Sequence, residues 1–172
     1  MSQPALIVID LQNDYFPGGA FPLWNTEEAL ANTLSAISRA RAKGVPVIHV
    51  QHVADPARGI SPFFNAGTEG VAIHAEVLAA APDAPVVVKH FADSFLDTAL
   101  EATLRQLGVD ELLVCGMMTQ NCVTHTAISP AAAGYKVSIL ADCCTTVSQM
   151  IHLIALNAVA PRLPIVQSAD AL

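Results

Sequence analysis

The stretch ALIVID (Ala5–Asp10) is an unbroken apolar run that ends on an aspartate. A strand with one face in water alternates apolar and polar residues, whereas a strand buried on both faces is apolar throughout. Strands of the second kind belong to parallel sheets that helices cover on both sides. The stretch therefore predicts a central strand of an α/β domain, with Asp10 at its carboxyl end.

Five further runs of this kind follow along the chain, and helical patterns separate them. The expected strands are VPVIHV (45–50), PVVVK (85–89), ELLVCG (111–116), KVSILAD (136–142) and LPIV (163–166). The expected helices run over 26–43 with Thr26 as cap, from Ser94 to about 108, over about 120–133, from Thr145 or Thr146 to about 160, and, as a short helix, from about Gly70.

Alternating strands and helices at this spacing give parallel strand pairs with right-handed crossovers. We therefore predict a three-layer α/β/α fold, Rossmann-like, with a mostly parallel sheet of about six strands. No linker or repeat divides the chain, so one domain over residues 1–172 is expected. Pro130 falls inside the expected helix over 120–133, and an interior proline should kink or break that helix early.

Composition excludes several classes of function. Apolar residues make up 53% of the chain and charged residues 13%, and the net charge is −7 with no basic run. Nucleic acids and anionic membrane surfaces both require clustered positive charge, so neither is an expected partner. We also expect no transmembrane helix and no leader peptide. Four cysteines without framework spacing indicate a reducing compartment, here the cytoplasm.

The chemistry-bearing residues fall at the predicted strand ends. Ligands bind beyond the carboxyl ends of the strands in an open parallel sheet, so these ends mark the candidate site. The residues found there are Asp10, then His49, Gln51 and His52, then Lys89 and His90, then Cys122 within GMMTQNCV, and finally Asp142. An acid, an ammonium and a thiol are each costly to bury alone, but together they offset one another.

Cys122 is the candidate nucleophile. It lies just inside a predicted helix, and a helix N-terminus lowers the pKa of a thiol and offers free N–H groups to an oxyanion. The alternative is a small buried apolar residue, the usual state of a free cysteine. Asp10 is either the base that takes the thiol proton, the group that orients Lys89, or a carboxylate that braces its loop. Lys89 either stabilises the thiolate or lies in solvent at a strand end.

These residues lie in motifs that resemble the isochorismatase-like cysteine hydrolases, a family that includes nicotinamidases and N-carbamoylsarcosine amidohydrolases. The matching stretches are ALIVIDLQNDYF, GTEGVAIHAEV, VVVKHFADSF, GMMTQNCVTHTA and GYKVSILADCCTT, in the family's order and spacing. The resemblance covers nearly the whole chain. It implies a catalytic triad of Asp10, Lys89 and Cys122, a cis peptide between Met117 and Met118, and an oxyanion hole formed by the backbone N–H groups of Met118 and Cys122.

The resemblance also implies the reaction, a cysteine-dependent hydrolysis of a C–N bond (amide, ureide or carbamoyl) in a small molecule through a thioester. Isochorismatases themselves cleave a vinyl ether without the cysteine, so Cys122 favours C–N chemistry. A vinyl-ether hydrolase and a non-catalytic binding protein of the same fold remain as alternatives. Family members are commonly oligomers, so a homo-oligomer, dimer or tetramer, is expected.

No cofactor and no metal are expected. Nicotinamidases bind a metal through an aspartate and histidines after the second strand, where this chain has HVQHVADPARG (49–59). His49 and His52 are three apart on an extended strand and should point to opposite faces. We therefore favour pocket-wall or hydrogen-bonded roles for both histidines over the alternative of a metal site. Candidates for the substrate pocket are the apolar Phe16, Phe21, Trp24, Phe63, Phe64 and Met118 and the polar Asn65, Thr119 and Gln120.

Overall fold

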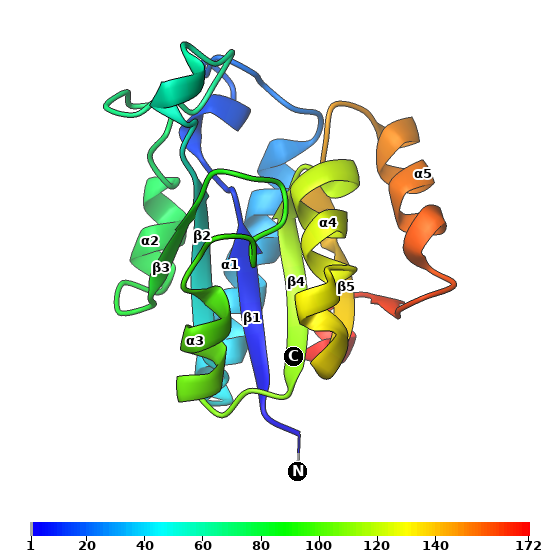
Figure 1. The fold of residues 1–172 in the computed structure, drawn as a ribbon. Helices are drawn as coiled ribbons and strands as arrows, with labels where there is room; N and C mark the ends of the chain where they lie inside the picture. Colours follow the sequence, from blue (N-terminus) through cyan, green and yellow to red (C-terminus); the bar gives the residue numbers. More distant parts are fainter. Residues whose placement is uncertain (1) are drawn as a thin grey trace.

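The computed structural model describes residues 2–172, and its strands form one sheet in the order β3-β2-β1-β4-β5-β6 (Figure 1). Every neighbouring pair in the sheet is parallel. The strands are β1 (Pro4–Ile9), β2 (Val47–His52), β3 (Val86–Lys89), β4 (Glu111–Met117), β5 (Lys136–Thr145) and β6 (Ile165–Val166). The predicted parallel sheet is confirmed, with β2 and β5 each reaching further than the sequence indicated.

Helices cover both faces of the sheet, so the predicted three-layer arrangement is also confirmed (Figure 1). Helix α1 contacts α2 and α6 on one face, whereas α3 and α4 lie over the other. The helices are α1 (Thr26–Ala42), α2 (Ala75–Ala80), α3 (Leu100–Gln106), α4 (Thr124–Ala127), α5 (Gln149–Val159) and α6 (Ser168–Ala171). Shorter turns are η1 (Asn13–Tyr15), η2 (Pro56–Arg58), η3 (Thr119–Val123, a π-turn) and η4 (Pro130–Gly134).

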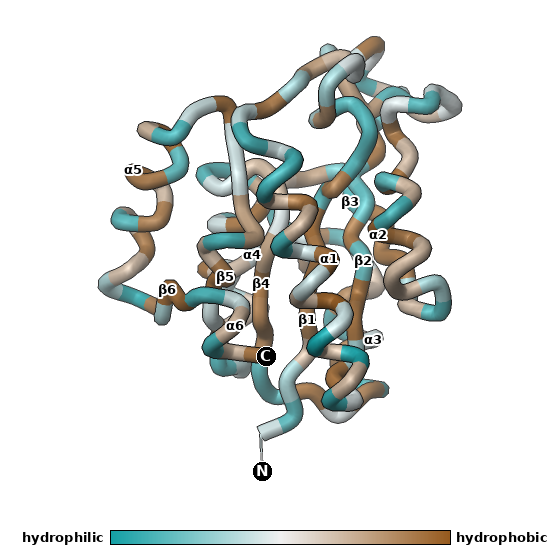
Figure 2. Tube along the Cα trace, turned by 180° about the vertical axis from the view of Figure 1, so that it is seen from behind, coloured by the Kyte–Doolittle hydropathy of each residue, from teal (hydrophilic) through white to brown (hydrophobic). Residues whose placement is uncertain are grey.

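The core lies where β1 and β4 meet at the centre of the sheet. Residues 5–9 of β1 are at most 2% exposed, and both strands are predominantly apolar along their length (Figure 2). Burial of a large aliphatic side chain stabilises a fold by about 1.5–3 kcal/mol. The central strands are therefore a rigid base, and the residues that follow their carboxyl ends are held in fixed positions.

The helix expected from Ser94 is wrong in its first six residues, since α3 begins only at Leu100. Asp97 has φ +54°, which a right-handed helix does not allow. Ser94 is buried, and its backbone N–H and its hydroxyl both bond to the Thr126 hydroxyl, at 3.0 and 2.8 Å. A tertiary contact thus holds Ser94 in place of a helix cap.

The helix expected over 120–133 is divided into three pieces: η3, α4 and η4. The break that Pro130 predicted is confirmed, since Pro130 opens η4 and the Ser129 hydroxyl accepts a hydrogen bond from the amide of Ala131. The π-turn was not predicted. It places Cys122 in a wider turn, rather than in the first turn of an α-helix.

Three predicted helix starts are also corrected. Asn25, in the left-handed conformation, precedes α1, so Thr26 is the first helical residue and not its cap. Strand β5 continues through Thr145, and α5 instead begins after Ser148, whose hydroxyl accepts from the amide of Ile151. Helix α2 begins at Ala75 and not near Gly70. Within residues 2–172, no helix has both the length and the apolar character that crossing a bilayer requires.

Candidate active site

Asp10, Lys89 and Cys122 meet at the carboxyl edge of the sheet. Asp10 follows β1, Lys89 ends β3, and Cys122 lies in η3 directly after β4. The Lys89 Nζ lies 2.9 Å from Asp10 Oδ2, and both side chains are fully buried. One donor atom from each of Asp10, His52 and Cys122 lies within 4.8 Å of the other two. Asp10, Lys89 and Cys122, which are far apart in the chain, therefore share one buried cluster in the fold.

The backbone at Asp10 is shaped by close contact between β1 and β4. Asp10 has φ +54°, a conformation that aspartate tolerates better than most residues. Gly116 on β4 has φ +126°, and a Cβ at this position would lie 2.0 Å from the carbonyl oxygen of Ile9. Only glycine allows β4 to approach so closely. The position of the Asp10 carboxylate thus depends on a residue in another strand.

Three acceptors surround the ammonium of Lys89. These are Asp10 Oδ2 at 2.9 Å, His52 Nδ1 at 3.0 Å and the carbonyl oxygen of Phe91 at 3.0 Å. Burial is the largest single effect and lowers the pKa of Lys89, but the interactions with Asp10 and Cys122 together outweigh it, and the net pKa is raised. Lys89 therefore remains charged, and an ammonium has three hydrogens for these three acceptors.

His52 belongs to this cluster as a hydrogen-bonded residue, one of the two roles that the sequence indicated for it. Because an ammonium only donates, His52 Nδ1 must accept from Lys89, and the ring proton then lies on Nε2. Burial and the charge of Lys89 lower the pKa of His52 to about 4, so the ring is neutral at pH 7. His49 points elsewhere, with Nε2 3.1 Å from the carbonyl oxygen of Ala81. The two histidines thus lie in different environments, as their spacing predicted.

The environment of Cys122 differs from the one expected at a helix N-terminus. The residue is 2% exposed. Burial, followed by the charge of Asp10, raises the pKa of the thiol, and the charge of Lys89 offsets this only in part. The thiol therefore keeps its proton at neutral pH and needs a base in order to react. Asp10 Oδ1 is fully buried and accepts no hydrogen bond from residues 2–172, so it is available to receive that proton.

The backbone before Cys122 presents a free donor. The peptide bond between Met117 and Met118 is cis. The carbonyl oxygen of Met118 accepts from the amides of Asn121 and Val123, at 3.0 and 3.3 Å. The amide of Met118 itself donates to no group in the described part of the chain, although Met118 is only 8% exposed. A buried amide without a partner can bind a developing oxyanion.

The predicted pocket residues fall into separate groups. The ring of Phe63 lies 5.3 Å from that of Tyr15. The ring of Trp24 lies 6.3 Å from that of His152, and the Thr119 hydroxyl is 2.9 Å from His152 Nδ1. Phe63 therefore belongs to the aromatic group around Tyr15, while Trp24 and Thr119 both contact His152 on α5.

Two other predicted pocket residues make contacts away from the triad. Phe16 stacks on His74 with ring centres 4.5 Å apart, and it lines a cavity that contains neither Asp10 nor Cys122. The side-chain amide of Asn65 exchanges two hydrogen bonds with the backbone of Ser61, at 2.9 and 2.8 Å. Its polar atoms are thus occupied within its own loop.

Asp142, which the sequence placed at the same edge, does not join the site. It lies within β5, because the strand continues to Thr145. Its carboxylate accepts from the amide and the hydroxyl of Ser168, at 2.8 and 2.7 Å, and so holds the start of α6.

Sequence reasoning missed two residues that shape the site, Asp14 and Tyr15. The Asp14 carboxylate accepts from the amide of Phe64 at 2.7 Å and from that of Ala20 at 3.1 Å, and so joins two loops. The ring of Tyr15 lies 4.5 Å from that of Phe64. Their position directly after β1, in QNDYF, was the available signal.

The cluster of Asp10, His52 and Cys122 offers carboxylate, imidazole and thiol donors of the kind that zinc accepts. The charged ammonium of Lys89 contacts two of the three donors, however. A cation there would lie next to a positive charge in a buried site, where charges repel strongly. The arrangement therefore fits a base, an ammonium and a nucleophile better than it fits a metal centre.

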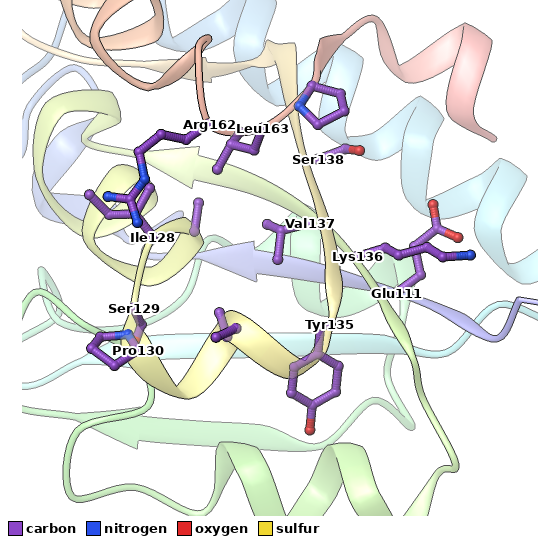
Figure 3. Close-up of a pocket in the computed structure, with 14 residues that line it drawn as sticks. Glu111, Ile128, Ser129, Pro130, Tyr135, Lys136, Val137, Ser138, Arg162 and Leu163 are labelled. Carbon is purple, nitrogen blue, oxygen red and sulfur yellow. The ribbon is translucent and has the colours of Figure 1, made fainter.

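A cavity of about 630 Å³ lies between η4, the start of β5 and the segment before β6 (Figure 3). Its walls include Ser129, Tyr135, Lys136 and Arg162. Because Lys136 begins β5, this cavity is at the amino ends of the strands. It contains none of the three clustered residues, so it is separate from the candidate active site.

Comparison with known proteins agrees with this geometry. The isochorismatase domain profile matches residues 4–171. The isochorismatase family protein YddQ of Bacillus subtilis is 43% identical over 148 residues, which are 86% of this chain and 81% of that protein. Maleamate amidohydrolase of Pseudomonas putida is 29% identical over 153 residues, 82% of this chain and 71% of that enzyme.

A solved structure supports the same assignment. The isochorismatase hydrolase of Oleispira antarctica superimposes with a TM-score of 0.89 at 30% identity, over 99% of this chain and 96% of the other. The profile match spans both β1, which precedes Asp10, and the turn that carries Cys122. The chain therefore belongs to the isochorismatase family of hydrolases, which includes amidohydrolases.

Proposed function

We propose that this protein hydrolyses a C–N bond in a small amide, ureide or carbamoyl compound through a thioester on Cys122. The observation that carries the proposal is the buried cluster in which a protonated thiol lies beside an aspartate that can take its proton. The similarity of this chain to maleamate amidohydrolase supports hydrolysis of an amide. The presence of the thiol favours this reaction over ether cleavage.

In the first half of the proposed reaction, Asp10 accepts the thiol proton as Cys122 Sγ attacks the carbonyl carbon. The carbonyl oxygen becomes an oxyanion, which the amides of Met118 and Cys122 bind. Collapse of this intermediate breaks the C–N bond, and Asp10 returns the proton to the departing nitrogen. The Lys89 charge stabilises whichever of Asp10 and Cys122 is ionised, since it lies beside both.

In the second half, water attacks the thioester carbonyl, and Asp10 takes one proton from that water. Collapse breaks the C–S bond, releases the carboxylic acid and returns the proton to the sulfur. Asp10 thus acts twice and ends in its starting state. One oxyanion donor in such a site lowers the activation free energy by on the order of 3 kcal/mol.

The proposal is tested by measuring ammonia release from maleamate, nicotinamide and N-carbamoylglycine. Cys122→Ala should lower turnover by at least about 10³-fold, because the nucleophile is lost. Cys143→Ala is the matched control, since Cys143 is also buried but lies in β5. Mass spectrometry of quenched reactions should find the acyl group on Cys122. Turnover that survives in Cys122→Ala would contradict the proposal.

A further inference from the structure

The first part of strand β5 has a partner strand on one side only. Its first residues pair with β4 alone, and β6 joins from Ile139 onward. The amide of Lys136 donates to the carbonyl of Asp110 on the β4 side, and that of Ile139 donates to the carbonyl of Pro164 on the β6 side, both at 3.0 Å. Backbone groups alternate sides along a strand, so the N–H and C=O of Val137 face the β6 side. Within residues 2–172, neither group has a hydrogen-bond partner.

Pro164 explains why this edge of β5 stays open. In the register of β5 and β6, the amide of residue 164 would lie opposite the Val137 carbonyl, but proline has no N–H. The amides of Arg162 and Leu163 both donate to the carbonyl of Val159, at 2.9 and 3.2 Å, so this segment stays with the end of α5. The chain before β6 therefore turns away from Val137 and leaves its donor and its acceptor without a strand beside them.

The open edge is one residue long. Toward the start of β5, the next residue on this side is Tyr135, and its amide already donates to the carbonyl of Ala132 at 3.0 Å. Toward the end of β5, Ile139 is paired with β6. A peptide that joins a sheet bonds to several alternate residues of the edge strand, so this edge is too short for a peptide. One donor beside one acceptor suits a small molecule that carries the complementary pair.

This edge lies in the wall of the cavity of about 630 Å³ at the amino ends of the strands (Figure 3). Small-molecule sites span about 300–1,000 Å³ and combine apolar walls with a few polar groups that fix orientation. Ile128 and Leu163 supply apolar walls here, and Figure 3 shows Val137 between Arg162 at one end and Lys136 at the other. Among the described residues, the Arg162 guanidinium has no ion-pair partner. The cavity thus has the size and the mixed lining of a ligand site.

We propose that this cavity is a second ligand site, in which the N–H and C=O of Val137 bind a small flat molecule that carries an acceptor next to a donor. Lactams, primary amides and ureides have this pair, since their C=O lies beside an N–H. The flat guanidinium of Arg162 stacks on the face of the ligand. The site lies at the opposite end of the strands from Cys122, so it goes beyond the proposed reaction and does not depend on it.

Amide NMR of nitrogen-labelled protein tests the proposal without any substitution. Val137 should exchange its amide hydrogen rapidly, whereas Ile139, which is bonded to Pro164, should exchange slowly. Addition of the lactam 2-pyridone should move the Val137 resonance and slow its exchange, with a Kd in the millimolar range, as the small size of the probe implies. N-Methyl-2-pyridone keeps the ring and the carbonyl but has no N–H, so its Kd should be about 3- to 10-fold higher.

Substitutions at the cavity give a second test. Pro164→Ala supplies an N–H that can bond to the Val137 carbonyl and so close the edge, and slow exchange of the new amide at position 164 shows that this bond has formed. The Kd of 2-pyridone should then rise by about 3- to 10-fold. Pro161→Ala is the matched control, because Pro161 is also exposed but does not line the cavity. Arg162→Gln should raise the Kd of both pyridones, since stacking does not need the N–H of the ligand.

Several outcomes would overturn the proposal. One is a Val137 resonance that does not respond to 2-pyridone at millimolar concentration, and another is equal affinity for both pyridones, because the edge would then only be hydrated. An unchanged Kd in Pro164→Ala, once its new bond has formed, would also contradict the proposal. Shifts confined to the amides of Met118 and Cys122 would place the probe at the catalytic cluster instead. The proposed hydrolysis is judged separately, since Cys122→Ala should leave the Val137 response unchanged.

Discussion

The Lys89 ammonium lies 2.9 Å from the Asp10 carboxylate, and solvent reaches neither side chain. A buried ion pair gains little net stability, because desolvation cancels most of the attraction. Removal of one partner is different, since it leaves a lone charge in the interior. The pair should therefore show strong coupling when its members are replaced one at a time and together.

Lys89→Met should lower the free energy of unfolding by about 3–5 kcal/mol, because Asp10 then lacks its counter-charge. Urea denaturation at pH 7 measures this change. The double variant Asp10→Asn with Lys89→Met has no buried charge at this site, so most of the lost stability should return. Both the single variant Lys89→Met and the double variant should remain inactive. Additive losses in the double variant would show that the two side chains do not interact.

The Cys122 thiol should ionise only at high pH. Burial and the charge of Asp10 raise its pKa, so half-ionisation should lie well above the usual value of about 8.5. Asp10→Asn removes one of these causes while the Lys89 charge remains, so the same thiol should then ionise at a lower pH. Thiolate absorbance at 240 nm follows the titration.

The absorbance of Cys122 is obtained by subtracting the titration of a Cys122→Ser variant from that of the wild-type protein, and likewise for Asp10→Asn. The three other cysteines contribute to both members of each pair and therefore cancel. Cys115, Cys143 and Cys144 are all buried and free. An unchanged or higher midpoint in Asp10→Asn would mean that the carboxylate does not act on the sulfur.

His52 should make the fold less stable in mild acid. Its pKa is lowered from 6.5 to about 4 in the folded protein. Between these two values the unfolded chain binds a proton that the folded chain does not, so stability falls as pH falls below 6.5. Between pH 7 and pH 5, His52 alone should lower the free energy of unfolding by about 2 kcal/mol. His52→Asn keeps an acceptor for Lys89 but cannot titrate.

Urea denaturation of both proteins at pH 7 and pH 5 measures the effect of His52. The wild-type protein should lose about 2 kcal/mol more than His52→Asn over this interval. His49 and His152, whose pKa values are also lowered by burial, contribute equally to both proteins. Equal losses would mean that His52 is not buried as a neutral ring.

The sheet and the strand ends could be predicted because each depends on a local pattern. A continuous apolar run marks a buried strand, and Asp10 and Lys89 each end such a run. The order of alternating elements then brings their ends to one edge. The homo-oligomer, the cytoplasmic location and the single domain over residues 1–172 stay predictions.

What the sequence could not reveal depends on contacts between distant residues. The thiol pKa of Cys122 was expected to fall at a helix end, but the raised value follows from burial beside Asp10, 112 positions earlier in the chain. The contact of His52 with Lys89 arises from the register of β2 and β3, in which the two residues are paired. The burial of Tyr15 depends on its ring contacts with Phe63 and Phe64, which belong to another loop.

The three acceptors around Lys89 also restrict which cation the site accepts. An arginine would keep the charge, but its flat guanidinium carries five hydrogens in a rigid fork. Three acceptors that suit a compact ammonium would leave two of those hydrogens facing closed protein. Lysine and arginine often replace one another on protein surfaces. At position 89 the number and direction of the hydrogens require lysine, so an arginine that keeps the positive charge would not preserve activity.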